Sequence, residues 1–187
     1  MNTNLLQRTI SRAFPGEMAA RATEVIFLFS VGMVAVLLHS KLRFPMHLPG
    51  KQGLLFVALV VTARGLSRWP FATSIACLGS ATLLLMPGLG FHDPFMAVNY
   101  MLMGGLMDVV FNQASRITPR MWIITGATGL CWVLIPMFRL AVSPFALVPM
   151  GAFSSGIAFP ILTHLAFGLA GGLFSAGLLG LLNRGSR

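Results

Sequence analysis

The residues of this chain that could do chemistry are few, and they suit recognition of a small molecule better than catalysis. Only four of the 187 residues are acidic, four are histidine and 13 are Lys or Arg. A few convergent polar groups among apolar helices are what a small-molecule pocket needs. The candidate binding residues can pair an anion, form a hydrogen bond or stack on a ring, and they are Lys41, Arg43, His47, His92, Asn99, Tyr100, Trp132, Arg139 and His164.

The histidines also raise metal or haem chemistry, because neutral imidazole is a common metal ligand. The candidate ligands are His39, His47, His92 and His164. No two of them have an HxxxH spacing, and Cys77 and Cys131 lie inside apolar runs without a CxxC motif. Two buried free thiols are therefore expected. We expect no cofactor, and the alternative is a haem-, quinone- or metal-binding subunit or assembly factor of a membrane complex.

Catalytic motifs are missing from the sequence. It contains no GxSxG, HExxH or Walker A pattern, so a protein that is not an enzyme is expected. Asp108 is the acid well within an apolar run. Its expected role is a structural ion pair with Arg64, Arg116 or Arg120, and a proton relay is the rarer alternative because a relay usually needs further titratable groups in line.

The composition identifies the elements that must position these residues. Hydrophobic residues make up 56% of the chain and charged residues 9%, whereas soluble domains carry about 25% charged residues. The sequence therefore predicts an all-α, multi-pass membrane bundle that forms a single integral domain over residues 1–187. The net charge of +9 does not indicate nucleic acid, because the basic residues are dispersed at the ends of apolar runs.

About six membrane spans are predicted, each bounded by charged residues, Pro or Gly. Residues 1–22 are expected to form a cytoplasmic amphipathic helix or a disordered segment. Residues 141–159 are expected to form a structured extracytoplasmic loop, and a seventh span there is the alternative. The predicted spans are about 23–40, 52–66, 70–89, 94–112, 119–140 and 160–182.

The basic residues predict the orientation of these spans. Cytoplasmic termini place nine Lys or Arg inside and four outside, which agrees with the positive-inside rule. Lys41, Arg43 and Lys51 are three of the four outside, and all lie in the loop 41–51. That exception indicates a loop with a binding role. The nine inside are Arg8, Arg12, Arg21, Arg64, Arg68, Arg116, Arg120, Arg184 and Arg187.

The last span carries small residues at every fourth position. Gly168, Gly172, Ala176 and Gly180 form a face that permits close helix contact. Packing within the bundle is favoured, and docking of another subunit is the alternative.

Three segments together resemble the S component of an energy-coupling-factor (ECF) transporter. They are the basic Pro/Gly-rich loop 41–51, the segment 100–111 with Gly104-Gly105-Leu106-Met107-Asp108, and the Gly-rich helix 164–182. The resemblance implies about six helices, cytoplasmic termini and capture of a vitamin or metal-related substrate under the loop between the first two helices. It also implies a membrane T subunit and cytoplasmic ATPases as partners, in the bacterial cytoplasmic membrane.

Overall fold

The computed structural model describes residues 5–14, 16–41, 48–67, 69–87, 95–114, 120–143 and 156–184. All regular secondary structure within these ranges is helical, as the sequence predicted. The helices are α1 (Leu5–Ala13), α2 (Glu17–Lys41), α3 (Gly53–Leu66), α4 (Ala72–Leu84), α5 (Phe95–Ala114), α6 (Arg120–Val142) and α7 (Ala158–Arg184).

The N-terminal segment differs from the expected one at its end. The helix α1 agrees with the predicted amphipathic helix, but α2 begins at Glu17, earlier than the predicted start of the first span at residue 23. Glu17 and Arg21 form an ion pair one turn apart, and an acid in the first turn favours the helix dipole. The charged residues Glu17 and Arg21, which lie before the predicted span, therefore extend its helix toward the N-terminus.

Four helices are long and apolar enough to cross a membrane: Glu17–Lys41, Phe95–Gln113, Trp122–Val142 and Ala158–Leu182. The helices α3 and α4 have 14 and 13 residues, which is shorter than the roughly 20 residues that a bilayer requires. The described part of the chain therefore contains four of the six predicted spans at full length. The expected loop 141–159 begins inside α6 and ends inside α7, and residues 144–155 lie outside the described residues.

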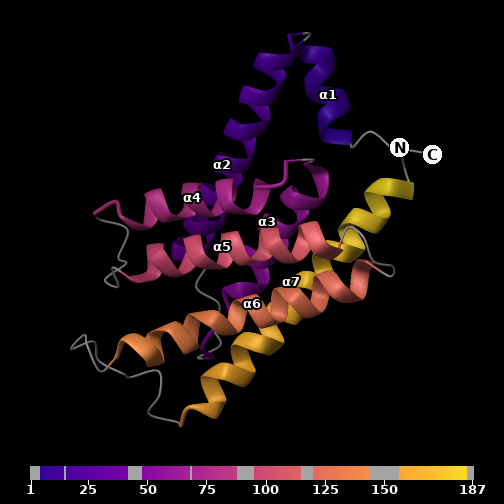
Figure 1. Ribbon diagram of the computed structural model, residues 1–187. Helices are drawn as coiled ribbons and strands as arrows, with labels where there is room; N and C mark the ends of the chain where they lie inside the picture. Colours follow the sequence, from indigo (N-terminus) through magenta and orange to yellow (C-terminus); the bar gives the residue numbers. More distant parts are fainter. Residues whose placement is uncertain are drawn as a thin grey trace.

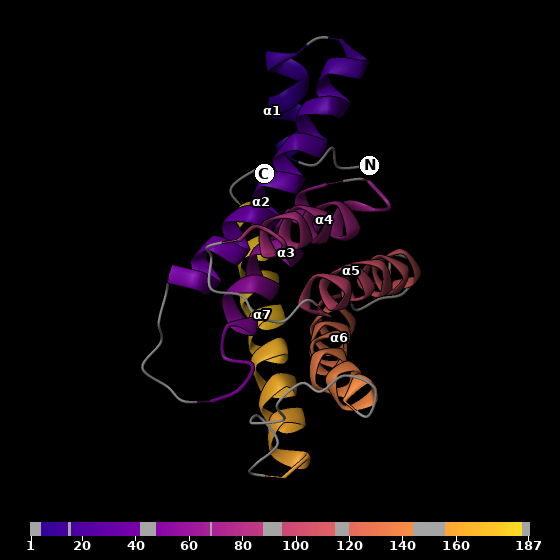
Figure 2. The ribbon, with the colours of Figure 1, turned by 90° about the vertical axis from the view of Figure 1, so that its left-hand side faces the viewer.

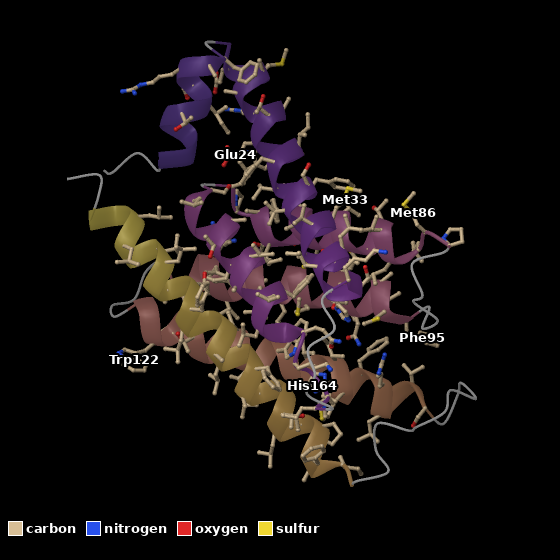
Figure 3. The ribbon with its side chains drawn as sticks, turned by 180° about the vertical axis from the view of Figure 1, so that it is seen from behind. Glu24, Met33, Met86, Phe95, Trp122 and His164 are labelled. Carbon is tan, nitrogen blue, oxygen red and sulfur yellow. The ribbon has the colours of Figure 1, made fainter. Side chains whose placement is uncertain are left out.

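The helices from α2 to α7 alternate in direction along the chain (Figure 1). The end of α4 at Met86 and the start of α5 at Phe95 lie on one side of the bundle, and Trp122 near the start of α6 lies on the opposite side (Figure 3). The hairpin of α1 and the first turns of α2 projects from the rest of the bundle (Figure 2). This alternation brings the ends of α2, α4 and α6 to one side, which we call the loop side.

Helices α2 and α4 are in direct backbone contact. A methyl group added at Gly32 would lie 1.7 Å from the carbonyl oxygen of Ala76, and one added at Gly79 would lie 2.1 Å from that of Phe29. Ser80 Oγ donates a hydrogen bond of 2.9 Å to the Gly32 carbonyl across the same interface. Only glycine permits this approach at both positions.

The small face of α7 packs inside the bundle, as predicted, over part of its length. A methyl group at Gly168 would lie 2.9 Å from Gly129 Cα, and one at Gly172 would lie 2.1 Å from Thr128 Oγ1, both on α6. A methyl group at Gly180 would meet nothing within 4 Å. The α6–α7 contact therefore lies in the first half of the face.

The main hydrophobic core is formed by side chains of α2, α3, α4, α5 and α6. Met103 and Met107 of α5 are each 1% exposed, and they pack with Phe56 of α3. Cys77 and Cys131 are buried free thiols, as the sequence predicted.

Candidate functional site

Four rings from four helices meet at the loop side of the core. The ring centroid of Phe56 of α3 lies 4.5 Å from that of Tyr100 of α5 and 5.6 Å from that of Trp132 of α6. The Trp132 ring stacks on His164 of α7, with centroids 6.3 Å apart and planes 29° apart. We call Phe56, Tyr100, Trp132 and His164 the aromatic cluster, and all four residues are at least nine-tenths buried.

The end of the loop between α2 and α3 lies directly on this cluster. Trp132 Nε1 donates a hydrogen bond of 3.2 Å to the Gly50 carbonyl. Gly50 has φ +79°, a conformation that favours glycine, and a methyl group there would lie 2.8 Å from His164 Cγ. A methyl group at Gly53 would lie 2.1 Å from Trp132 Nε1. Residues 48–53, which we call the cap segment, therefore approach the two rings as closely as backbone can.

The polar atoms around the cluster are only partly paired. Asn99 is 2% exposed and donates through Nδ2 to the Ile135 carbonyl at 3.4 Å, whereas its Oδ1 has no hydrogen-bond partner among the described residues. The Tyr100 hydroxyl and His39 Nδ1 are 3.4 Å apart, which is long for such a bond.

The structure brings together several of the residues predicted from the sequence. Tyr100, Trp132 and His164 belong to the cluster, Asn99 precedes Tyr100 on α5, and Arg139 lies seven residues after Trp132 on α6. Lys41 is exposed at the end of α2. The other three predicted residues lie outside the described residues, and they are Arg43, His47 and His92.

Sequence reasoning missed the residues that complete the cluster. Phe56 is a fully buried member of the cluster, yet it stands in an apolar run with nothing to distinguish it from its neighbours. Gly50 carried a signal, because Pro49-Gly50 is typical of a tight turn. Gly53 carried none, since a glycine at the start of a helix is common.

The four histidines predicted as alternative metal ligands are not all described. Within the described part of the chain, no group of three or more His, Cys, Asp or Glu side chains could hold a metal ion. His39 lies against Tyr100, and His164 donates from Nδ1 to the Pro160 carbonyl at 2.7 Å. His47 and His92 lie outside the described residues.

A second buried polar region lies on the side away from the cap segment, and Asp108 of α5 is at its centre. Asp108 accepts hydrogen bonds from the backbone N–H of Thr73 at 3.0 Å and of Ser74 at 2.7 Å, and from Ser74 Oγ at 2.7 Å. Because these N–H groups belong to the first turn of α4, the carboxylate caps that helix. Arg64 Nε lies 3.5 Å from Asp108 Oδ1, so the predicted ion pair is confirmed, with Arg64 as the partner.

The Arg64 guanidinium extends this region toward neighbouring helices. Its Nη2 donates to Asn112 Oδ1 at 2.8 Å, and its Nη1 points to the Ser67 carbonyl at 3.4 Å. Asn112 in turn donates to the Pro70 carbonyl at 3.0 Å. These contacts join α3, α5 and the turn before α4, so Arg64, Asp108 and their partners hold helix ends together. We call this set the charged network.

Comparisons with protein families, with curated proteins and with solved structures found no match. The fold itself defines a class: within the described residues all regular structure is helical and four helices are long and apolar enough to cross a membrane, which is compatible with a multi-pass membrane protein.

Proposed function

We propose that this protein is a substrate-capture membrane subunit of an ECF-type importer, which binds a small molecule at the aromatic cluster. The observation that supports this most directly is the convergence of Tyr100, Trp132 and His164 under the cap segment. Rings from three helices give stacking surfaces, and a glycine-tight segment above them excludes water.

The polar atoms beside the cluster suit recognition of a vitamin-like or metal-related molecule with an anionic group. Asn99 Oδ1 is a buried acceptor without a partner, and such an atom is costly unless a ligand donates to it. Arg139 adds a positive charge on α6, seven residues after Trp132. An acceptor, a cation and stacking rings together favour a heterocyclic anion as the substrate.

The position of Phe56 limits how such a molecule can enter the cluster. Its ring is fully buried between Tyr100 and Trp132, so a bound heterocycle takes the place of that ring or displaces the cap segment. Movement of the cap segment breaks the hydrogen bond from Trp132 to Gly50 and the close contacts of Gly50 with His164 and of Gly53 with Trp132. In this proposal the cap segment is the entrance of the site.

The orientation and partners belong to the same proposal. With six spans and cytoplasmic termini, the loop side faces outward in the bacterial cytoplasmic membrane, which agrees with the distribution of Lys and Arg. Since the sequence contains no Walker A motif, transport would draw on separate ATPases through a membrane T subunit.

The test is mass spectrometry of small molecules that co-purify with the full chain in mild detergent. The wild type should retain one small anionic molecule, and Asn99→Leu should lower its occupancy by about tenfold or more, because a buried hydrogen bond to the ligand is lost. Thr125→Val is the matched control. Thr125 Oγ1 is also buried without a hydrogen-bond partner, but Thr125 belongs to α6 and not to the aromatic cluster. A retained molecule with equal occupancy in Asn99→Leu and Thr125→Val would contradict the proposal.

One observation favours the alternative, a haem-, quinone- or metal-binding subunit. Because His164 Nδ1 donates to the Pro160 carbonyl, Nε2 is the unprotonated nitrogen of the neutral ring, which is the arrangement of a metal-ligating histidine. Visible absorbance and metal analysis of the purified chain separate the two functions. A Soret band or bound metal that His164→Ala removes would favour the alternative.

A further inference from the structure

A cavity of about 320 Å³ lies between α1 and the first turns of α2, far from the aromatic cluster. Figure 3 labels Glu24 near this hairpin and His164 at the other end of the molecule. Ile10 and Phe14 line the cavity on the side of α1, and Glu17, Arg21 and Glu24 line it on the side of α2. Two of the four acids of a chain with net charge +9 therefore face one cavity.

Glu24 is the unusual residue of this cavity. It is 5% exposed, and its Oε1 accepts a hydrogen bond of 2.6 Å from Ser67 Oγ. Glu17 pairs with Arg21, and Asp108 pairs with Arg64. Among the residues that the structure describes, no cation pairs with Glu24. A buried carboxylate is strongly unfavourable unless a positive charge or further donors compensate it.

The remaining lining indicates what kind of cation would compensate Glu24. The cavity is far larger than a bare metal ion, and no group of three metal-ligating side chains occurs in the described ranges. Ile10 and Phe14 give this largely polar cavity an apolar part. A cavity that holds a carboxylate and some apolar and aromatic surface suits an organic cation, whose charge pairs with the acid while its carbon atoms contact the apolar side chains.

We propose that the α1–α2 cavity binds a primary organic ammonium group, with Glu24 as its counter-ion. In this proposal the ammonium donates to Oε2 of Glu24, while the Ser67 hydroxyl donates to Oε1. Two sources carry this chemistry, a free small amine and the ethanolamine headgroup of a phospholipid. The proposal concerns the end of the molecule away from the cap segment and does not rest on substrate capture.

Calorimetric titration of the full chain in a neutral detergent with ethanolammonium chloride tests the free amine. Native mass spectrometry from nanodiscs that contain phosphatidylethanolamine tests the lipid. In at least one of the two assays the wild type should bind, and Glu24→Gln should weaken binding about tenfold or more, because it removes the charge and keeps the size. Binding only in the nanodisc assay assigns the lipid headgroup.

Two further variants make the result decisive. Glu17→Gln is the matched control, since Glu17 lines the same cavity but is exposed and paired with Arg21; it should change binding less than about threefold. Arg68→Gln tests whether Arg68, rather than a ligand, supplies the positive charge next to Glu24. Arg68 follows Ser67 in sequence and itself lies outside the described residues. The proposal is overturned if neither probe binds, if Glu24→Gln binds as the wild type does, or if binding appears only after Arg68→Gln.

Discussion

The aromatic cluster and the charged network are both buried regions of one helical bundle, but they differ in how their buried acceptor oxygens are paired. In the charged network, Asp108 accepts three hydrogen bonds and faces Arg64, and most of these contacts go to backbone of the α4 first turn. In the aromatic cluster, the contacts are mainly ring against ring. Beside it, Asn99 keeps a bare oxygen.

This difference separates a structural role from a binding role. A carboxylate whose oxygens already accept backbone hydrogen bonds has few acceptor positions for a ligand. Removing one residue of such a network leaves its buried partners unpaired. In a set of packed rings with an unpaired acceptor beside it, the loss of one contact should lower the stability of the fold less. The two regions should therefore respond to substitution in opposite ways, the first through stability and the second through ligand and cap segment.

The largest expected effect is at Asp108. Asp108→Ala leaves Arg64 buried without its counter-ion and the first turn of α4 without its cap, so the free energy of unfolding should fall by about 3–5 kcal/mol. Thermal unfolding in detergent, followed by circular dichroism, measures it. Asp108→Asn keeps an acceptor for the α4 N–H groups and should cost less. Equal melting temperatures for wild type and Asp108→Ala would remove the distinction between the two regions.

An intermediate effect is expected at the contact of the cap segment with Trp132. Gly53→Val places a side chain where Trp132 Nε1 now lies, and it should lower the unfolding free energy by about 1–3 kcal/mol through overpacking. Tryptophan fluorescence should shift to the red as Trp132 becomes wetter. Gly105→Val is the control, since a methyl group at Gly105 meets nothing within 4 Å. The same fluorescence change in both variants would contradict the close contact.

The smallest effect on stability is expected from loss of one hydrogen bond. Trp132→Phe keeps a ring in the cluster but removes the donor to the Gly50 carbonyl, at a cost of about 1 kcal/mol. The cap segment should open more often, so tryptic cleavage after Lys51 should be about fivefold faster. Trp122→Phe, at a residue 72% exposed near the start of α6, should leave the rate unchanged. An unchanged rate in Trp132→Phe would mean that another contact holds the segment.

The helices were predictable from the sequence because apolar runs in this chain end at Pro, Gly or charged residues. The prediction of 52–66 agrees closely with α3, Gly53–Leu66, and 160–182 agrees with α7. The start of α2 was placed too late, because the predicted span began at residue 23, whereas the helix begins at Glu17, where Glu17 and Arg21 pair with each other. The predicted span 70–89 was long enough to cross a bilayer, but the helix that forms there, α4, has only 13 residues.

The candidate site was predictable only where alternation of spans decides which residues share a side. Trp132 and His164 are 32 positions apart in sequence, and they meet because α6 and α7 run in opposite directions. The role of Asp108 at the first turn of α4 was not predictable, because it depends on which backbone N–H groups a neighbouring helix presents. Phe56 was missed for a related reason, since only tertiary packing distinguishes it from the other apolar residues of α3.

The glycine contact between α2 and α4 has a mechanical consequence. Where Gly32 meets Ala76 and Gly79 meets Phe29, sliding by one residue would drive a side chain into the opposite backbone, and the Ser80 hydrogen bond would break. The two helices must therefore travel as one rigid body during any rearrangement of the bundle. A hinge should be sought outside this pair, and a disulfide engineered between α2 and α4 should leave the motion of the cap segment unchanged.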